Sequence, residues 1–148
     1  MRVRVVIAED AALFRAGLTR LIEDRGHQVC AAVGDGDALL AAVVEHQPDV
    51  VVADIRMPPT HTDEGLRAAL EIRRQYPHTG VLVLSQYIET RYTARLLEGN
   101  AAGIGYLLKE DGSTSDYLLL TTWGSKGEQG AQPDGRLDPF AQNALAVV

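Results

Sequence analysis

One apolar run constrains the fold of this chain more than any other stretch. Residues Val50–Ala53 are β-branched or small, do not alternate with polar residues, and lead directly into Asp54. Such a short apolar run is typical of a strand buried on both faces, as in a parallel sheet. Pro58 and Pro59 follow and mark a loop. Open α/β sheets keep their ligand sites at the carboxyl ends of their strands, so Asp54 is expected to be a reactive carboxylate.

Similar runs recur along the chain, with helical spacing between them. Apolar runs predict the strands, and apolar residues spaced three and four apart predict the helices. The expected strands cover Val3–Ala8, Val29–Val33, Val50–Ala53, Val81–Leu84 and Gly103–Leu108, and the expected helices cover Ala11–Glu23, Ala38–His46, Asp63–Tyr76 and Glu89–Glu98. Gly34–Asp37 is expected to form a turn that caps the second helix, and Asp63 to cap the third. This alternation indicates a parallel α/β sheet with helices on both faces.

The pattern weakens after Lys109. Asp116–Trp123 is compatible with a short helix, whereas Gly124–Gly135 is rich in Gly, Gln and Ser and has no apolar period. We therefore expect one domain over residues 1–123, with a poorly defined last helix, and a flexible or divergent tail over residues 124–148.

Composition narrows the classes of function. The formal net charge is −6 and the only lysines are Lys109 and Lys126, so this segment is not expected to bind nucleic acid. Cys30 is the only cysteine, which excludes an internal disulfide and indicates a reducing, cytoplasmic setting. No apolar stretch approaches the roughly 18 residues that cross a bilayer, so no membrane association is expected.

Polar side chains gather at the predicted carboxyl edge of the sheet. Glu9 and Asp10 follow the first strand, Asp54 the third, Ser85 the fourth and Lys109 the fifth. Neighbouring carboxylates repel one another, and a divalent cation such as Mg²⁺ relieves that repulsion. Lys109 can pair with Asp54 or with a transferred phosphoryl group, and the Ser85 hydroxyl can contact the same phosphoryl group. This set predicts phosphoryl transfer onto Asp54 with Mg²⁺ as the cofactor.

Together these residues resemble the receiver domain of bacterial two-component response regulators. Val6–Asp10, Leu13–Arg15 and Leu84–Tyr87 are similar to the LuxR-like (NarL/FixJ) class, and the resemblance covers about Arg2–Glu110. It implies that residues 1–123 form a receiver domain with a flavodoxin-like fold. That fold is a doubly wound, five-stranded parallel sheet with spatial order 2-1-3-4-5, counted along the chain.

The resemblance also implies the composition of a metal site. Asp10 and Asp54 bind Mg²⁺ directly, together with the backbone carbonyl of Arg56, and Glu9 acts mainly through water. Asp54 is the phosphoacceptor, and its partner is a sensor histidine kinase that carries a phosphohistidine.

The remaining implied roles concern the response to phosphorylation. Ser85 and Lys109 bind the phosphoryl group, and Tyr106 matches the switch aromatic whose ring turns inward when Ser85 moves. The implied function is a signalling switch rather than an enzyme, able to form a phosphorylation-dependent homodimer and to control transcription in a full-length relative. The DNA-binding helix-turn-helix usual in this class is not expected in this chain.

Two alternative functions stay open. A phosphatase that forms an aspartyl phosphate uses a second Asp two residues further on as its general acid, and here that position is Arg56. A pseudo-receiver, which docks without being phosphorylated, is favoured by the indistinct last helix but disfavoured by the complete acidic set. The histidines show no metal-ligand spacing and are expected to be solvated: His27, His46, His61 and His78.

Overall fold

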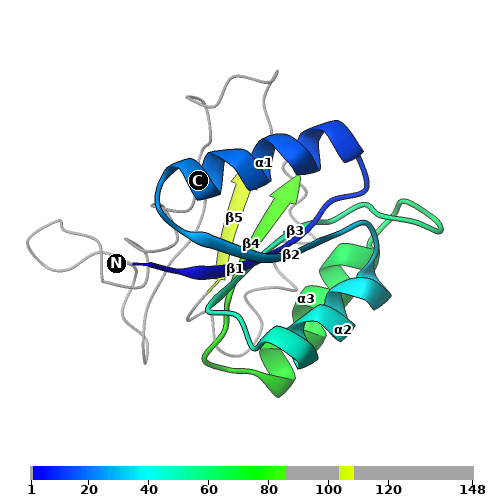
Figure 1. Ribbon diagram of the computed structural model, residues 1–148. Coiled ribbons are helices and arrows are strands. Elements are labelled where there is room, and N and C mark those ends of the chain that lie inside the picture. Colours follow the sequence, from blue (N-terminus) through cyan, green and yellow to red (C-terminus); the bar gives the residue numbers. More distant parts are fainter. Residues whose placement is uncertain (1, 86–103, 109–148) are drawn as a thin grey trace, which may run out of the picture.

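The computed structural model describes residues 2–85 and 104–108, which form a parallel sheet with helices on both faces (Figure 1). The strands are β1 (Arg4–Ala8), β2 (Gln28–Val33), β3 (Val50–Asp54), β4 (Gly80–Ser85) and β5 (Ile104–Leu108). The helices are α1 (Ala12–Asp24), α2 (Gly36–His46) and α3 (Glu64–Gln75). Each begins and ends within a few residues of its predicted limits. The predicted helix Glu89–Glu98 and everything after Leu108, including the predicted last helix and tail, lie outside the described residues.

The strands lie in the order β2-β1-β3-β4-β5, and every neighbouring pair is parallel. This confirms the predicted flavodoxin-like topology. In the register of the sheet Asp54 lies beside Leu84, and Ser85 lies beside Leu108. The carboxyl ends of β3, β4 and β5 therefore meet at one edge.

The buried strand residues alternate between two cores, one on each face of the sheet. Val6, Val51 and Val83 belong to the core that includes residues of α2 and α3. Ile7, Val52 and Leu82 belong to the core that includes Leu18 and Ile22 of α1. Figure 1 shows α1 on one side of the sheet and α2 and α3 on the other. All five residues of β3 are buried, as predicted for a strand covered on both faces.

Side chains fix both ends of α2. The Asp35 carboxylate accepts a hydrogen bond from the Ala38 N–H at 2.7 Å, which confirms the predicted cap, although the helix begins two residues earlier than expected. At the other end, the Arg4 guanidinium donates to the carbonyl oxygens of His46 and Gln47 at 2.6 and 3.0 Å. These carbonyls are among those that a helix leaves without an internal partner, so Arg4 ties the end of α2 to β1.

The predicted cap of α3 is wrong. Asp63 occupies the N-cap position, but its side chain makes no capping hydrogen bond. Its carboxylate instead pairs with Arg67 at 3.0 Å. The carboxylate that accepts the N–H groups of this turn belongs to Glu64.

Helix α3 approaches β3 most closely at Gly65. A Cβ atom at this position would lie 1.6 Å from the carbonyl oxygen of Asp54. The Gly65 N–H donates to the Ile55 carbonyl at 2.9 Å, and the Ile55 N–H donates to the Leu84 carbonyl at 3.0 Å. These two bonds connect α3, the end of β3 and β4, and so hold the Asp54 backbone in place.

Strand β2 lies at one edge of the sheet and contains an irregularity. Val5 pairs with Val29 but Val6 pairs with Ala31, so Cys30 is an additional residue on β2. Such an insertion is a β-bulge, which bends the strand and increases its local twist.

Candidate functional site

Three acidic side chains converge at the carboxyl edge of the sheet. Glu9 and Asp10 follow β1, and Asp54 is the last residue of β3. One carboxylate oxygen from each lies within 4.8 Å of the others. Glu9 and Asp54 are only 1% and 9% exposed, whereas the side chain of Asp10 is 27% exposed. The sequence prediction of an acidic cluster at this edge therefore agrees with the geometry.

Hydrogen bonds hold Glu9 in place. Its backbone N–H donates to the Val33 carbonyl at 2.9 Å, and its side chain accepts from the Ala11 N–H at 3.1 Å. The Arg15 guanidinium donates to the Glu9 carbonyl at 2.7 Å. The turn between β1 and α1 is thus tied to β2 and to α1, which gives the acidic cluster a rigid frame.

The donor set fits a divalent cation. Carboxylate oxygens are the protein ligands that Mg²⁺ prefers, and it usually keeps several waters beside them. Carboxylates at this separation raise one another's energy when all are charged, and a bound cation removes that penalty. The chemistry of the three side chains therefore suits Mg²⁺.

The other predicted site residues lie within or just after β3, β4 and β5. Ser85, at the end of β4, is 4% exposed, and the side chain of Arg56 is exposed in the loop after β3. Tyr106 lies beside Val83 in the register of β5, where only the backbone is described. Lys109 follows Leu108, the register partner of Ser85, but lies outside the described residues.

The expectation that the histidines are solvated is wrong for His27, which is 9% exposed and accepts a hydrogen bond from the Val3 N–H at Nδ1. It holds for His61, whose side chain is 54% exposed, but sequence reasoning missed that the Nε2 of His61 also lies 3.1 Å from Oδ2 of Asp10. No local pattern connects the two, because they are separated by 51 positions in the chain. The backbone of this loop is unusual in two places: the φ of His61 is positive, at 55°, and the peptide bond between Pro58 and Pro59 is cis.

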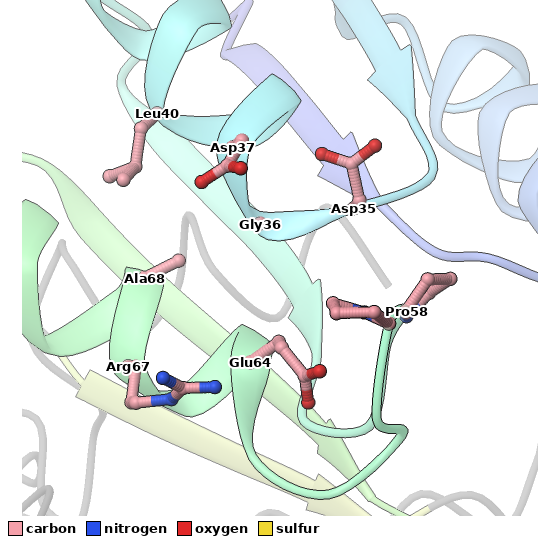
Figure 2. Close-up of a pocket in the computed structure, with 9 residues that line it drawn as sticks. Asp35, Gly36, Asp37, Leu40, Pro58, Glu64, Arg67 and Ala68 are labelled. Atoms are coloured by element: carbon pink, nitrogen blue, oxygen red, sulfur yellow. The ribbon is translucent and has the colours of Figure 1, made fainter.

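A hollow of about 630 Å³ lies on another side of the same loop (Figure 2). It opens between the starts of α2 and α3, and none of the three clustered carboxylates lines it. The lining residues are Asp35, Gly36, Asp37, Leu40, Pro58, Pro59, Glu64, Arg67 and Ala68. The loop between β3 and α3 therefore contacts the acidic cluster through His61 and borders this hollow through its prolines.

The fold and the acidic edge define the class of protein. The chain belongs to the response regulator receiver domain family, whose family model matches residues 5–114. Members of this family are signalling modules that partner sensor histidine kinases, rather than classical enzymes. Receiver domains bind Mg²⁺ at an acidic site, which is the kind of cluster that Glu9, Asp10 and Asp54 form.

Individual relatives place the chain among the LuxR-like response regulators. The oxygen regulatory protein NreC of Staphylococcus haemolyticus is 34% identical over 118 residues, which are 79% of this chain and 52% of that protein. The chain spans about half the length of the NreC proteins that it matches.

Solved structures agree with this placement. The signal receiver domain of NarL from Mycobacterium tuberculosis is 35% identical, with a TM-score of 0.61 over 70% of this chain and 82% of that one. A DNA-binding response regulator of the LuxR family from Staphylococcus aureus is 27% identical, with a TM-score of 0.64 over 74% of this chain and 88% of that one. The predicted resemblance is therefore confirmed.

Among residues 2–85 and 104–108, no helix has the length and apolar character needed to cross a bilayer.

Proposed function

We propose that this domain is a phosphoacceptor switch, in which Asp54 receives a phosphoryl group from the phosphohistidine of a sensor kinase with Mg²⁺ as the cofactor. The observation that supports this most strongly is the convergence of Glu9, Asp10 and Asp54, with one oxygen from each within 4.8 Å of the others. Asp54 is the member of the set at the end of a fully buried strand.

The chemistry is a direct transfer between two side chains. A carboxylate oxygen of Asp54 attacks the phosphorus, the P–N bond of the phosphohistidine breaks, and its electron pair returns to the imidazole ring. Asp10, Asp54 and the Arg56 carbonyl would hold Mg²⁺, with Glu9 acting mainly through water. When bound, the ion offsets the charge that develops on the phosphoryl oxygens.

Ser85 and Lys109 are assigned to the phosphoryl group once it is attached. An aspartyl phosphate carries about two negative charges, so it attracts a hydroxyl donor and an ammonium group. The Ser85 hydroxyl moves toward the phosphate, and the Tyr106 ring follows it inward, which transmits the change to the surface. Transcriptional control, phosphorylation-dependent dimerisation and a cytoplasmic location stay predictions, as does a receiver domain over residues 1–123.

Intact mass spectrometry tests the phosphoacceptor directly. The protein is incubated with Mg²⁺ and acetyl phosphate, and a single phosphoryl adduct is expected. Asp54→Asn should abolish the adduct, whereas Asp24→Asn should keep it, because Asp24 lies on the surface at the far end of α1. Excess chelator present during the incubation should prevent formation of the adduct, since the transfer depends on the cation.

The outcomes separate the remaining alternatives. No adduct on the wild-type protein would favour a docking module, and sustained turnover of phosphate esters would favour a phosphatase. An adduct that survives in Asp54→Asn would move the acceptor to another residue. An undiminished yield in excess chelator would contradict the metal assignment.

A further inference from the structure

The loop between β3 and α3 brings a fourth potential ligand to the acidic cluster. Nε2 of His61 lies 3.1 Å from Oδ2 of Asp10, and the His61 side chain is 54% exposed, so the imidazole lies at the open side of the cluster. Asp10 is itself the most exposed of the three clustered carboxylates. An ion that enters from solvent at Asp10 would therefore meet the imidazole as well.

A buried carboxylate holds the segment on both sides of His61. Glu64 is 8% exposed and accepts from the Thr60 N–H and hydroxyl at 2.6 and 2.7 Å. It also accepts from the N–H groups of Thr62 and Asp63 at 3.1 and 3.2 Å. Burial raises the pKa of Glu64, but these hydrogen bonds from Thr60 and Thr62 outweigh it and lower the pKa to about 2. The carboxylate is therefore ionised at neutral pH, the form that accepts such bonds best.

His61 itself is anchored through its backbone. Its N–H donates to the Met57 carbonyl at 2.9 Å, and its φ is 55°. The residues on each side of His61 are bound to Glu64 and its own N–H is occupied, so the imidazole is presented from a fixed backbone. Such preorganisation is what a ligand-bearing side chain needs in order to bind without a large loss of entropy.

The separation of the two side-chain atoms suits shared coordination of one ion. In an octahedral shell with ligands about 2.1 Å from the metal, adjacent ligands are about 3.0 Å apart. The 3.1 Å between Nε2 of His61 and Oδ2 of Asp10 matches that spacing. A hydrogen bond has the same length. His61 and Asp10 can therefore contact each other directly when no ion is bound, and both can bind one ion with little movement.

We propose that His61 is a nitrogen ligand of the cation site, so that the site favours first-row transition ions such as Ni²⁺ over Mg²⁺ more strongly than carboxylates alone would. The inference rests on the proposed function, because it takes the cation site to be formed by Glu9, Asp10 and Asp54. Imidazole nitrogen is a good ligand for nickel and zinc, whereas Mg²⁺ takes oxygen ligands and water. With Mg²⁺, a water takes the place that His61 fills with a transition ion.

Cation affinity, measured by calorimetry on untagged protein, tests the assignment without reference to phosphorylation. His61→Asn is the variant of choice, since Asn tolerates a positive φ and removes the imidazole. The affinity for Ni²⁺ should fall at least about tenfold. Removing a residue that only supports a metal ligand already lowers metal affinity by about tenfold or more, and His61 is proposed as a ligand itself. The affinity for Mg²⁺ should change less than about twofold. His78→Asn, an exposed histidine after α3, should leave both affinities unchanged.

A second readout follows the ligand itself. The visible absorption of bound Ni²⁺ should move to longer wavelength in His61→Asn, because an oxygen ligand gives a weaker field than imidazole. The inference is overturned if Mg²⁺ and Ni²⁺ lose affinity equally, or if neither the Ni²⁺ affinity nor its spectrum changes. Absence of Mg²⁺ binding and of a phosphoryl adduct on the wild-type protein would overturn the proposed function and this inference together. Mg²⁺ binding with an adduct, but without an effect of His61→Asn on Ni²⁺, would overturn this inference alone.

Discussion

The contact between α3 and β3 leads to a sharp prediction about stability. In Gly65→Ala, the new Cβ would lie 1.6 Å from the Asp54 carbonyl oxygen, a separation that must grow to at least 3.0 Å. The position of the Cβ is fixed by the backbone of α3, and the oxygen belongs to the backbone of β3. No side chain can therefore rotate away, and α3 itself must move. Forcing additional atoms into a packed core typically costs about 1–3 kcal/mol. Movement of α3 also breaks the bond from Gly65 N–H to the Ile55 carbonyl, which leaves a buried group unpaired at about 1–3 kcal/mol.

The combined loss is about 4 kcal/mol, a large part of the roughly 5–15 kcal/mol that stabilises a domain. Urea unfolding followed by circular dichroism measures it. With a slope of about 1–3 kcal/mol per molar, the midpoint should fall by about 2 M.

Gly17 provides a matched control for the same substitution. It also lies within a helix, α1, but a Cβ there would have nothing within 4 Å. Gly17→Ala should therefore raise stability by about 0.5–1 kcal/mol, because alanine is the better helix former. A loss below about 1 kcal/mol in Gly65→Ala, or equal effects of the two substitutions, would refute the reasoning.

Three further predictions concern individual side chains. Folding lowers the pKa of Glu64 from 4.5 to about 2, so its contribution to stability is present above pH 4.5 and lost as the pH falls toward 2. Glu64→Gln should flatten the decline of the urea midpoint over that range, and a decline as steep as that of the wild type would contradict this. Arg4→Met removes the two bonds to the end of α2 and should cost about 1–2 kcal/mol in urea unfolding; an unchanged midpoint would show that solvent replaces them. Arg15→Met removes the bond to the Glu9 carbonyl and should weaken Mg²⁺ binding about tenfold in calorimetry, whereas an affinity equal to wild type would mean that Glu9 is fixed without Arg15.

The sequence was most informative where the structure depends on local pattern. The apolar run before Asp54 predicts a buried strand because burial on two faces requires apolar residues at every position, and β3 is buried throughout. Glu9, Asp10 and Asp54 could be placed together because parallel strands bring their carboxyl ends to one edge of the sheet. These predictions needed only strand order and strand ends.

The features that the sequence did not reveal depend on distant contacts. Gly65 looks like an ordinary helical glycine until β3 is placed against it. Asp63 has the residue type of a helix cap, but Glu64 accepts the N–H groups of the turn because Thr60 and Thr62 fold around its carboxylate. His61 reaches Asp10 only because that turn is folded. Each is a packing outcome that residue spacing does not encode.

The bulge at Cys30 has a consequence for how copies of this protein meet in concentrated solution. An edge strand with an even row of N–H and C=O groups is a template on which another chain can add a strand. In β2 the additional residue interrupts that row between the partners of Val5 and Val6. A strand of a second molecule that paired along this edge would lose its hydrogen-bonding register at the bulge. The irregularity therefore opposes edge-to-edge aggregation, although β2 contains no charged residue.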